Sequence, residues 1–183
     1  MKAFRRVSAP VAVLDRADVD TDQIIPKQFL KRIERTGYGE FLFFDWRKDP
    51  DFELNRPEYA DARILLTGRN FGCGSSREHA AWALQDYGFD VVIAPSFGDI
   101  FRQNALKIGL LPIAADEAGE LMGYSGQTIE VDLEAQEIRA PGGYTVPFEL
   151  GEFERHCILE GLDEIRLTLQ HEGDIAAYEA AHD

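Results

Sequence analysis

The sequence predicts an α/β protein with a parallel core sheet, flanking helices and a small additional β section. Short apolar runs at 64–67, 91–94 and 110–114 alternate with segments of helical pattern at 76–87 and 96–107. Strands separated by helices of this length are joined by right-handed crossovers, which makes neighbouring strands parallel. Further along the chain, short strands and turns replace this alternation and indicate an antiparallel section.

The first part of the chain predicts one strand and one short helix. The apolar run 11–14 is typical of a buried strand, and an acidic, polar loop follows it at 15–22. Pro26 then opens a short helix that reaches Arg32, because proline is tolerated at the first helical position. The aromatic run 41–44 is compatible with a strand or with a buried helix.

Glycines divide the helical segments. Gly88 and Gly109 follow the two central helices, where a C-terminal glycine is common. In the C-terminal tail, residues 149–183, Gly161 divides the helical pattern into two helices. Gly173 is expected to interrupt the second of them.

Three short strands are expected before that tail, at 128–133, 137–140 and 144–148. The segments between them are rich in turn-forming residues. We therefore expect a single domain over residues 1–183, with a core at about 11–148 and a helical tail after it.

Composition limits the possible partners. The chain has 183 residues, enough for one domain with a substantial core, and a net charge of −14 from 33 acidic and 19 basic side chains. This charge repels a polyanion, so we expect no nucleic-acid partner. A carboxylate ligand would need a local cluster of arginine and lysine. No apolar run approaches the ~20 residues of a membrane-spanning helix. No signal-type apolar segment follows the basic N-terminus, so we expect no membrane partner and a cytoplasmic location.

The two cysteines, Cys73 and Cys157, are far apart in the sequence. They could form a disulfide, although two cysteines do not make a disulfide framework. Two thiolates are also too few to hold an iron–sulfur cluster in the usual way. A thiol between glycines, as Cys73 is, is more often a small packed residue than a metal ligand. We predict no metal site in this chain.

The most informative segment is the glycine-rich turn 68–80, Gly-Arg-Asn-Phe-Gly-Cys-Gly-Ser-Ser-Arg-Glu-His-Ala, between a strand and a helix. Glycines allow positive φ and the close approach of a ligand. In an open parallel sheet, ligands usually bind at loops that follow the carboxyl ends of strands. The turn is neither a Walker phosphate loop nor the nucleophile elbow of hydrolases, and Arg77 stands where a dinucleotide fingerprint has its third glycine.

Two interpretations of the serine pair stay open. Ser75 and Glu78 have the spacing of a capping box, in which Ser75 would only cap the helix. Arg77 would then lie in the first helical turn, where the dipole disfavours a cation by roughly 0.3–1 kcal/mol. This cost suggests that Arg77 has a function. A serine beside a helix N-terminus and a guanidinium is in a setting that stabilises an oxyanion, as a serine alkoxide base requires.

The segment 68–80 resembles the signature of the swivelling domain of the aconitase superfamily. Further segments agree with this resemblance, at 20–26, 94–101 and 104–113. Two others, 29–37 and 43–47, resemble the bacterial isopropylmalate dehydratase small subunits in particular. The resemblance covers most of the first 115 residues and implies a swivelling β/β/α domain.

The resemblance implies a hydro-lyase that interconverts 2- and 3-isopropylmalate by dehydration and rehydration in leucine biosynthesis. Loss of hydroxide needs a Lewis acid, in this family a [4Fe–4S] cluster held by three cysteines. Because this chain has only two cysteines, we expect it to bind no cofactor and expect the cluster on a large-subunit partner. The implied assembly is a heterodimer or a heterotetramer, and the implied substrate is a small dicarboxylate hydroxy acid.

The resemblance also implies roles for individual residues. Ser75 is the expected alkoxide base, Arg77 stabilises the alkoxide and binds a substrate carboxylate, and Asp22 supports the acid–base network. The expected substrate-binding residues are Ser76, Thr21, Gly74, Leu30, Lys31 and Arg32. Among them, Leu30 would face the isopropyl group, and the two cations would contact a carboxylate.

Structural alternatives exist for several of these residues. Asp22 could be a turn residue, Lys31 and Arg32 could complement a helix dipole, and His79 is expected to be a packed helix residue. For the whole chain, one alternative is the small subunit of a related hydro-lyase acting on homoaconitate, citramalate or dimethylmalate. Another is a non-catalytic anion-binding or regulatory module.

Overall fold

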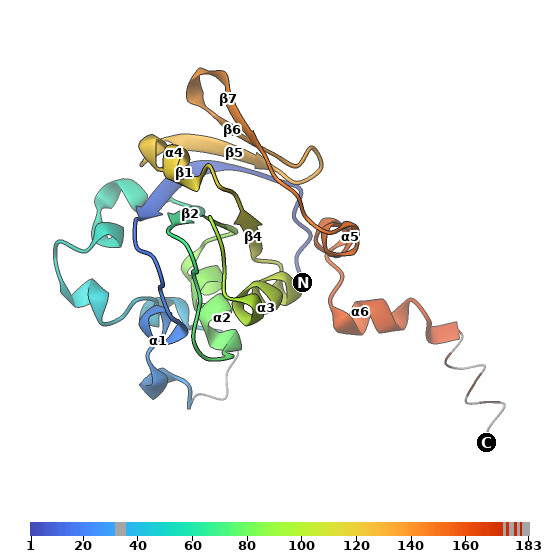
Figure 1. The fold of residues 1–183 in the computed structure, drawn as a ribbon. Helices are drawn as coiled ribbons and strands as arrows, with labels where there is room; N and C mark the ends of the chain where they lie inside the picture. The colour runs from blue at the N-terminus through green and yellow to red at the C-terminus, as the bar shows by residue number, and fades with distance from the viewer. Residues whose placement is uncertain (32–35, 174, 176–177, 179, 181–183) are drawn as a thin grey trace.

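In the computed structural model, which describes residues 1–31, 36–173, 175, 178 and 180, seven strands form one curled sheet (Figure 1). Their order across the sheet is β4-β3-β2-β1-β5-β6-β7. Neighbours among β1 to β4 run parallel, whereas β5, β6 and β7 extend the other side of β1 with antiparallel pairing. The strands are β1 (Arg6–Leu14), β2 (Ile64–Thr67), β3 (Val91–Ala94), β4 (Leu111–Ala114), β5 (Thr128–Asp132), β6 (Glu137–Ala140) and β7 (Tyr144–Pro147). The predicted α/β class, with a parallel core and a small extra β section, is confirmed.

β1 joins the two parts of the sheet. Its first half pairs antiparallel with β5, from Arg6 opposite Asp132 to Pro10 opposite Thr128, and its second half pairs in parallel with β2. The strand is longer than the predicted 11–14. The first half alternates exposed and buried residues, so it lacks the apolar run that identifies a strand buried on both faces.

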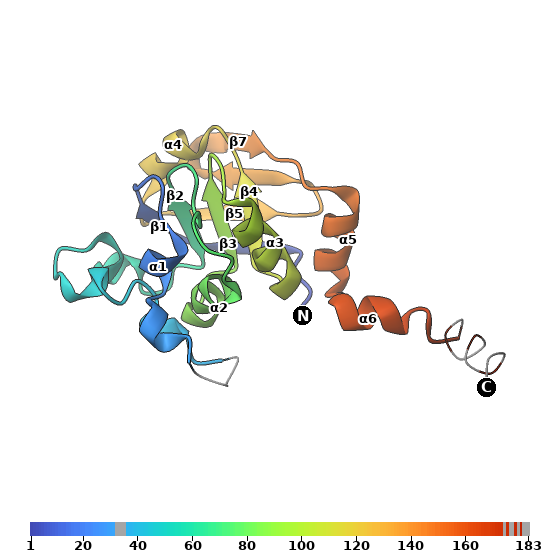
Figure 2. The same ribbon diagram turned by 60° about the horizontal axis from the view of Figure 1, so that its bottom comes forward.

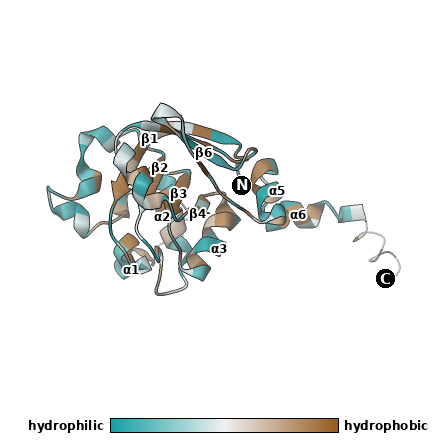
Figure 3. Ribbon diagram, turned by 45° about the horizontal axis from the view of Figure 1, so that its top comes forward, coloured by the Kyte–Doolittle hydropathy of each residue, from teal (hydrophilic) through white to brown (hydrophobic). Residues whose placement is uncertain are grey.

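The parallel strands are buried on both faces, and hydrophobic residues gather in them (Figure 3). Leu65 and Val92 belong to a core shared with α2 (Glu78–Tyr87) and α3 (Asp99–Ile108). Ile64 and Val91 belong to a second core, shared with α4 (Ala118–Leu121) and the antiparallel strands. Since successive side chains of a strand point to opposite faces, burial on both faces makes the sequence of these strands continuously apolar.

A short helix, α1 (Thr21–Ile24), begins at the end of the segment 15–22 that the sequence predicts as a loop. Its N-cap Asp20 accepts hydrogen bonds from the backbone N–H groups of Asp22 and Gln23, both at 2.8 Å. Gln23 Oε1 in turn accepts from the N–H of Asp20 at 2.9 Å. This is a capping box, and it explains why four residues are enough to form a helical turn here.

Turns occupy the next segment instead of the predicted helix 26–32. Its described part holds the 3₁₀ turn Lys27–Phe29, and Arg32 lies outside the described residues. The run 41–44 is neither strand nor α-helix, because Phe43 has a φ of +51° that interrupts both. Other 3₁₀ turns are Gly39–Phe41, Trp46–Lys48, Glu53–Asn55, Pro57–Tyr59, Met122–Tyr124 and Pro141–Gly143. No helix of the described segments is long and apolar enough to cross a membrane.

The C-terminal tail forms an arm that leaves the body of the molecule (Figures 1 and 2). As predicted, Gly161 separates two helices, α5 (Glu152–Glu160) and α6 (Glu164–Leu169), with a φ of +67°. The predicted break at Gly173 is wrong. The chain turns at 170–171 and is helical again at 172–173, because the last turn of α6 tightens and closes before that glycine.

Candidate active site

The loops after β1, β2 and β3 meet at the carboxyl edge of the parallel strands. The N–H of Gly72 donates to the carbonyl of Val19 at 2.7 Å, which ties the second loop to the first. The N–H of Phe71 donates to the carbonyl of Ser96 at 3.1 Å, and the N–H of Gly98 donates back to Phe71 at 2.9 Å. Because Ser96 belongs to this network, α3 begins after the loop and not at residue 96 as predicted.

Two positions in these loops must be glycine, because neighbouring atoms lie too close to leave room for a Cβ. Gly72 has a φ of +74°, and a Cβ there would lie 2.2 Å from the ring of Phe101 in α3. A Cβ on Gly98 would lie 2.6 Å from the carbonyl oxygen of Gly72. The glycine-rich turn therefore rests directly on α3 and on the loop that precedes it.

Thr21 holds the backbone that carries the serine pair. Its N–H donates to the carbonyl of Cys73 at 3.0 Å, and its hydroxyl donates to the carbonyl of Ser75 at 3.2 Å. Ser75 and Ser76 are exposed, and within the described part of the chain neither hydroxyl has a hydrogen-bond partner. Gly74, with a φ of +91°, is also exposed. The serine hydroxyls are thus free to meet a ligand.

The predicted capping box at Ser75 is wrong. The N-cap of α2 is Arg77, which has extended backbone angles, φ −130° and ψ 113°, and makes no side-chain capping hydrogen bond. The helix starts at Glu78, so Arg77 does not lie in the first turn. The reason is that Thr21 already binds the carbonyls of Cys73 and Ser75, which holds the chain extended at this point.

The N-terminus of α2 is consequently uncapped. Among the described residues, no acceptor meets the backbone N–H groups of Glu78, His79 and Ala80. These are the groups that carry the positive end of the helix dipole. The setting that stabilises an oxyanion is therefore present beside the serines, although by a different local geometry from the predicted one.

Arg77 and Asp22 form an ion pair across the site, through NH1 and Oδ1. The other carboxylate oxygen of Asp22 lies 3.5 Å from Nζ of Lys27. The side chain of Arg77 is 14% exposed, whereas that of Asp22 is 41% exposed. The structure thus brings together Asp22, Thr21, Ser75 and Arg77, as the sequence predicts, and gives Asp22 the position of a group that orients Arg77.

A cleft of about 660 Å³ adjoins this site and is lined by Leu30, Ser76 and Arg77. Leu30 is half-buried and packs against the core that is shared with α2 and α3. The rest of its side chain faces the cleft. Lys31 is exposed beside it. The role predicted for Arg32 concerns a residue outside the described ranges.

Further residues that the sequence does not predict as site residues also line the cleft, among them His79, Ile100 and Asn104. Ile100 is 46% exposed, and Asn104 is 8% exposed on the buried face of α3 between Phe101 and Ala105. The sequence does contain a signal for Asn104, because this polar residue interrupts the apolar stripe of a predicted helix.

Two groups at the serine turn, His79 and Cys73, have pKa values shifted toward their uncharged forms. Burial lowers the pKa of His79, and together with the nearby guanidinium of Arg77 it outweighs the opposing effect of the Glu78 carboxylate. The neutral imidazole packs between aromatic rings, 4.6 Å from Trp82 and 5.2 Å from Tyr38 between centroids. Burial, followed by the nearby acidic side chains, raises the pKa of Cys73. This thiol is protonated at neutral pH, as expected of a packed residue and not of a nucleophile.

Known proteins share these features. The aconitase C-terminal domain family matches residues 1–118. A 3-isopropylmalate dehydratase small subunit from Acidobacterium capsulatum is 54% identical, over all of this chain and 92% of its own length. The chain belongs to the family of 3-isopropylmalate dehydratase small subunits. The LeuD_N family matches residues 121–152, and the family of the C-terminal domain of these small subunits matches residues 164–183.

Other family members agree in sequence and in fold. A small subunit from Bacillus licheniformis is 55% identical over 98% of this chain and 96% of its own length. A solved structure of 3-isopropylmalate dehydratase from Methanocaldococcus jannaschii has a TM-score of 0.73 at 30% identity, covering 95% of this chain and 99% of that one. The predicted superfamily, the fold and the small-subunit assignment are confirmed.

The residues of this chain do not fit an iron–sulfur cluster. Cys73 lies in the glycine-rich turn and Cys157 lies on α5, and burial raises the pKa of the Cys157 thiol. Within the described residues, no group of three or more histidine, cysteine or acidic side chains could hold a metal ion.

Proposed function

We propose that this chain works with a large subunit that carries a [4Fe–4S] cluster, and that together they interconvert 2-isopropylmalate and 3-isopropylmalate in leucine biosynthesis. The observation that carries the proposal is the exposed Ser75 beside the uncapped N-terminus of α2 and the guanidinium of Arg77. The relatives, which are 3-isopropylmalate dehydratase small subunits, support the reaction, and the cysteine count of this chain supports a cluster on another chain.

Ser75 acts as the base. The α2 N–H groups and Arg77 stabilise its alkoxide, which takes the proton from the carbon next to a carboxylate. The electrons of the broken C–H bond form the C=C double bond, and hydroxide leaves the neighbouring carbon. In the second half-reaction hydroxide adds to the carbon that lost the proton, and Ser75 returns the proton to the carbon that lost hydroxide. The cluster supplies the Lewis acidity that hydroxide loss needs.

Asp22 and Thr21 position the residues that react. Asp22 pairs with Arg77 and Lys27, so it fixes the guanidinium where it can meet a substrate carboxylate. Thr21 is 1% exposed and its hydroxyl is occupied by the carbonyl of Ser75. We therefore assign Thr21 to holding the serine turn, in place of the direct substrate contact that its motif predicts.

The substrate is a small hydroxy acid with two carboxylates, and the cleft matches its parts. Leu30 offers an apolar contact for the isopropyl group, and Ser76 and Gly74 lie exposed at the same turn for hydrogen bonds. Lys31 and Arg32 contact a carboxylate from the same segment. Residues 1–183 act as one swivelling domain that closes over the large subunit, in a heterodimer in the cytoplasm.

Reconstitution tests this proposal. The chain is co-expressed with the cluster-bearing large subunit from the same genome, the complex is purified without oxygen, and turnover is followed with isopropylmalate and with cis-homoaconitate. We expect co-purification, turnover of isopropylmalate by the complex and no turnover by either chain alone. Activity of this chain without an iron–sulfur partner would contradict the division of labour. Preference for cis-homoaconitate would identify a related hydro-lyase instead.

A further inference from the structure

The buried face of α3 carries one polar side chain, Asn104, between Phe101 and Ala105. Asn104 is 8% exposed, and its Nδ2 is buried with no hydrogen-bond partner among the described residues. A buried amide donor without an acceptor is unfavourable, and such groups in native proteins call for an explanation. A ligand that brings an acceptor to this position would satisfy it.

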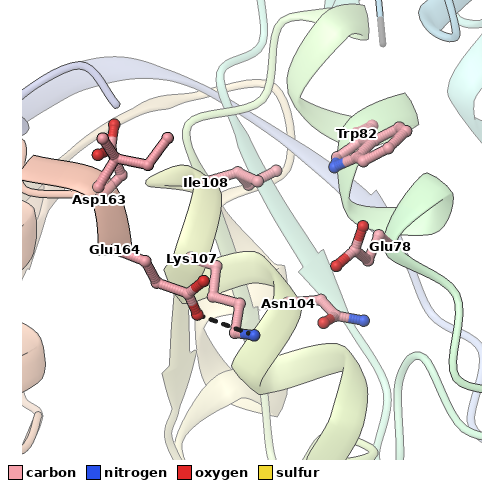
Figure 4. A pocket seen from close by; sticks show the side chains of 8 residues that line it. Glu78, Trp82, Asn104, Lys107, Ile108, Asp163 and Glu164 are labelled. Atoms are coloured by element: carbon pink, nitrogen blue, oxygen red, sulfur yellow. Dashed lines mark ion pairs between the residues drawn. The ribbon is translucent and has the colours of Figure 1, made fainter.

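Asn104 lies where two hollows of the surface adjoin. It lines the active-site cleft with Ser76 and Arg77, and it lines a smaller hollow of about 260 Å³ where α2 and α3 meet the start of α6. Figure 4 shows its side chain beside Glu78 of α2 and Lys107 of α3, with Nζ of Lys107 paired to Glu164 at 3.1 Å.

The uncapped N-terminus of α2 is a second, independent source of donors at the same cleft. Its N–H groups at 78–80 have no acceptors among the described residues, and the ten-residue helix adds the positive end of its dipole. Arg77 and Lys107 bring positive charge to the lining. Glu78 is the acidic side chain of the described lining, and it is exposed. Because Arg77 is paired with Asp22 and Lys107 with Glu164, the N–H donors without an acceptor are what favours an anionic oxygen ligand here.

We propose that Asn104 and the N-terminus of α2 form a carboxylate-binding subsite. Nδ2 of Asn104 donates to one carboxylate oxygen, and the N–H groups of Glu78 and His79 donate to the other. The choice of a carboxylate rests on the proposed function, which gives the substrate class. Since Arg77 is already paired with Asp22, this subsite can take a carboxylate without breaking that ion pair. A dicarboxylate can thus be held at two points on this chain.

Kinetics of the reconstituted complex test the subsite. Asn104→Asp keeps the side-chain shape, removes the donor and adds a negative charge. We expect KM for isopropylmalate to rise by at least about tenfold, the factor that a lost hydrogen bond to a charged group implies. We expect kcat to change by less than about threefold, because binding is lost equally in the ground and transition states. Asn104→Ala should raise KM in the same direction if Asn104→Asp fails to fold.

Gln127→Glu is the matched control, because it makes the same change from amide to carboxylate at an exposed position outside both hollows. We expect its KM to change by less than about twofold, as for most exposed substitutions. An equal rise in KM for Gln127→Glu would show a general charge effect and overturn the subsite. An unchanged KM in Asn104→Asp, with the complex active, would overturn it as well.

Binding to the full chain without its partner separates this subsite from the reaction. The ¹⁵N-labelled chain is titrated with malate and, separately, with chloride, and the amide resonances of residues 78–80 are followed. We expect malate to shift them in the wild type and not in Asn104→Asp. Equal shifts with chloride, or with the variant, would contradict the subsite. Malate-specific shifts in a chain whose complex does not turn over isopropylmalate would instead reject the proposed function and keep the subsite.

Discussion

Each half of the sheet pairs an arginine with carboxylate groups, but the surroundings of the two arginines differ. At the carboxyl edge of the parallel strands, Arg77 meets Asp22 beside N–H groups that have no acceptor in the described chain. On the antiparallel strands, Arg139 lies 2.6 Å from a carboxylate oxygen of Glu130 and 3.1 Å from one of Glu137, so its charge is neutralised locally. In a chain of net charge −14, these N–H groups at the positive end of the helix dipole are what can attract an anionic substrate.

The largest expected effect is a loss of kcat on substitution in the parallel half of the sheet and not in the antiparallel half. Ser75→Ala should lower kcat by about 10²–10⁴-fold, the usual contribution of a positioned general base, while the complex still assembles. Ser76→Ala, its neighbour on the same turn, should mainly raise KM. Arg139→Gln on the antiparallel strands should change kcat/KM by less than about twofold. A loss of kcat in Arg139→Gln as large as in Ser75→Ala would remove the functional distinction between the halves.

The next effect concerns Asp22. Asp22→Asn should lower kcat/KM by roughly 10- to 100-fold, because a hydrogen bond to a charged group is worth about 1.5–3 kcal/mol. Glu53→Gln is the control, since Glu53 accepts two hydrogen bonds from Arg16, at 3.2 and 3.0 Å, outside the proposed site. Steady-state kinetics on both variants decide the matter. Equal losses would mean that ion pairs act here through stability and not through the position of Arg77.

The structure also shows which parts of this comparison the sequence can predict. Strands buried on both faces, such as β2 and β3, are predicted with their observed bounds, because their apolar runs do not depend on distant contacts. Two segments share the local pattern of a capping box, Asp20 with Gln23 and Ser75 with Glu78. The first caps α1 and the second does not cap α2.

The difference between those two segments is tertiary. Thr21 binds the carbonyl of Ser75, 54 residues away, and this contact sets the backbone of the serine turn. A local pattern carries no information about such a contact. The sequence contains the residue types that the proposed chemistry needs, whereas the position of Arg77 outside the helix and the burial of Asn104 follow from packing.

A third expected effect is a difference in unfolding free energy between alanine substitutions at one glycine in each half. Gly72 and Gly142 both have positive φ, +74° and +77°, but a Cβ on Gly142 meets nothing within 4 Å, whereas one on Gly72 overlaps Phe101. Gly142→Ala should cost about 1–2 kcal/mol of unfolding free energy for the left-handed backbone alone. Gly72→Ala should cost about 1–3 kcal/mol more for overpacking. Chemical denaturation measures both, and equal losses would show that the turn does not rest on α3.

The smallest effect concerns pH and the antiparallel half. The N–H of Ala135 donates to Asp132 at 3.0 Å, and Arg6 and Arg139 lie nearby, so the pKa of Asp132 is below its usual value. A lowered folded pKa stabilises the fold above the unfolded value of about 3.9 and ceases to do so as pH falls through the folded pKa. Wild type should therefore exceed Asp132→Asn in stability near neutral pH, and the gap should shrink on acidification. A gap that stays constant down to about pH 3, well below the unfolded pKa, would contradict this.

The most direct test follows the carbon–hydrogen bond itself. Substrate deuterated at the carbon that loses its hydrogen is mixed with excess complex, and deuterium loss is measured in a single turnover for the wild type and for Ser75→Ala, together with substrate affinity. We predict that Ser75→Ala slows deuterium loss by at least about 100-fold while affinity changes by less than about threefold. Deuterium loss at the wild-type rate in Ser75→Ala would show that another group takes the proton.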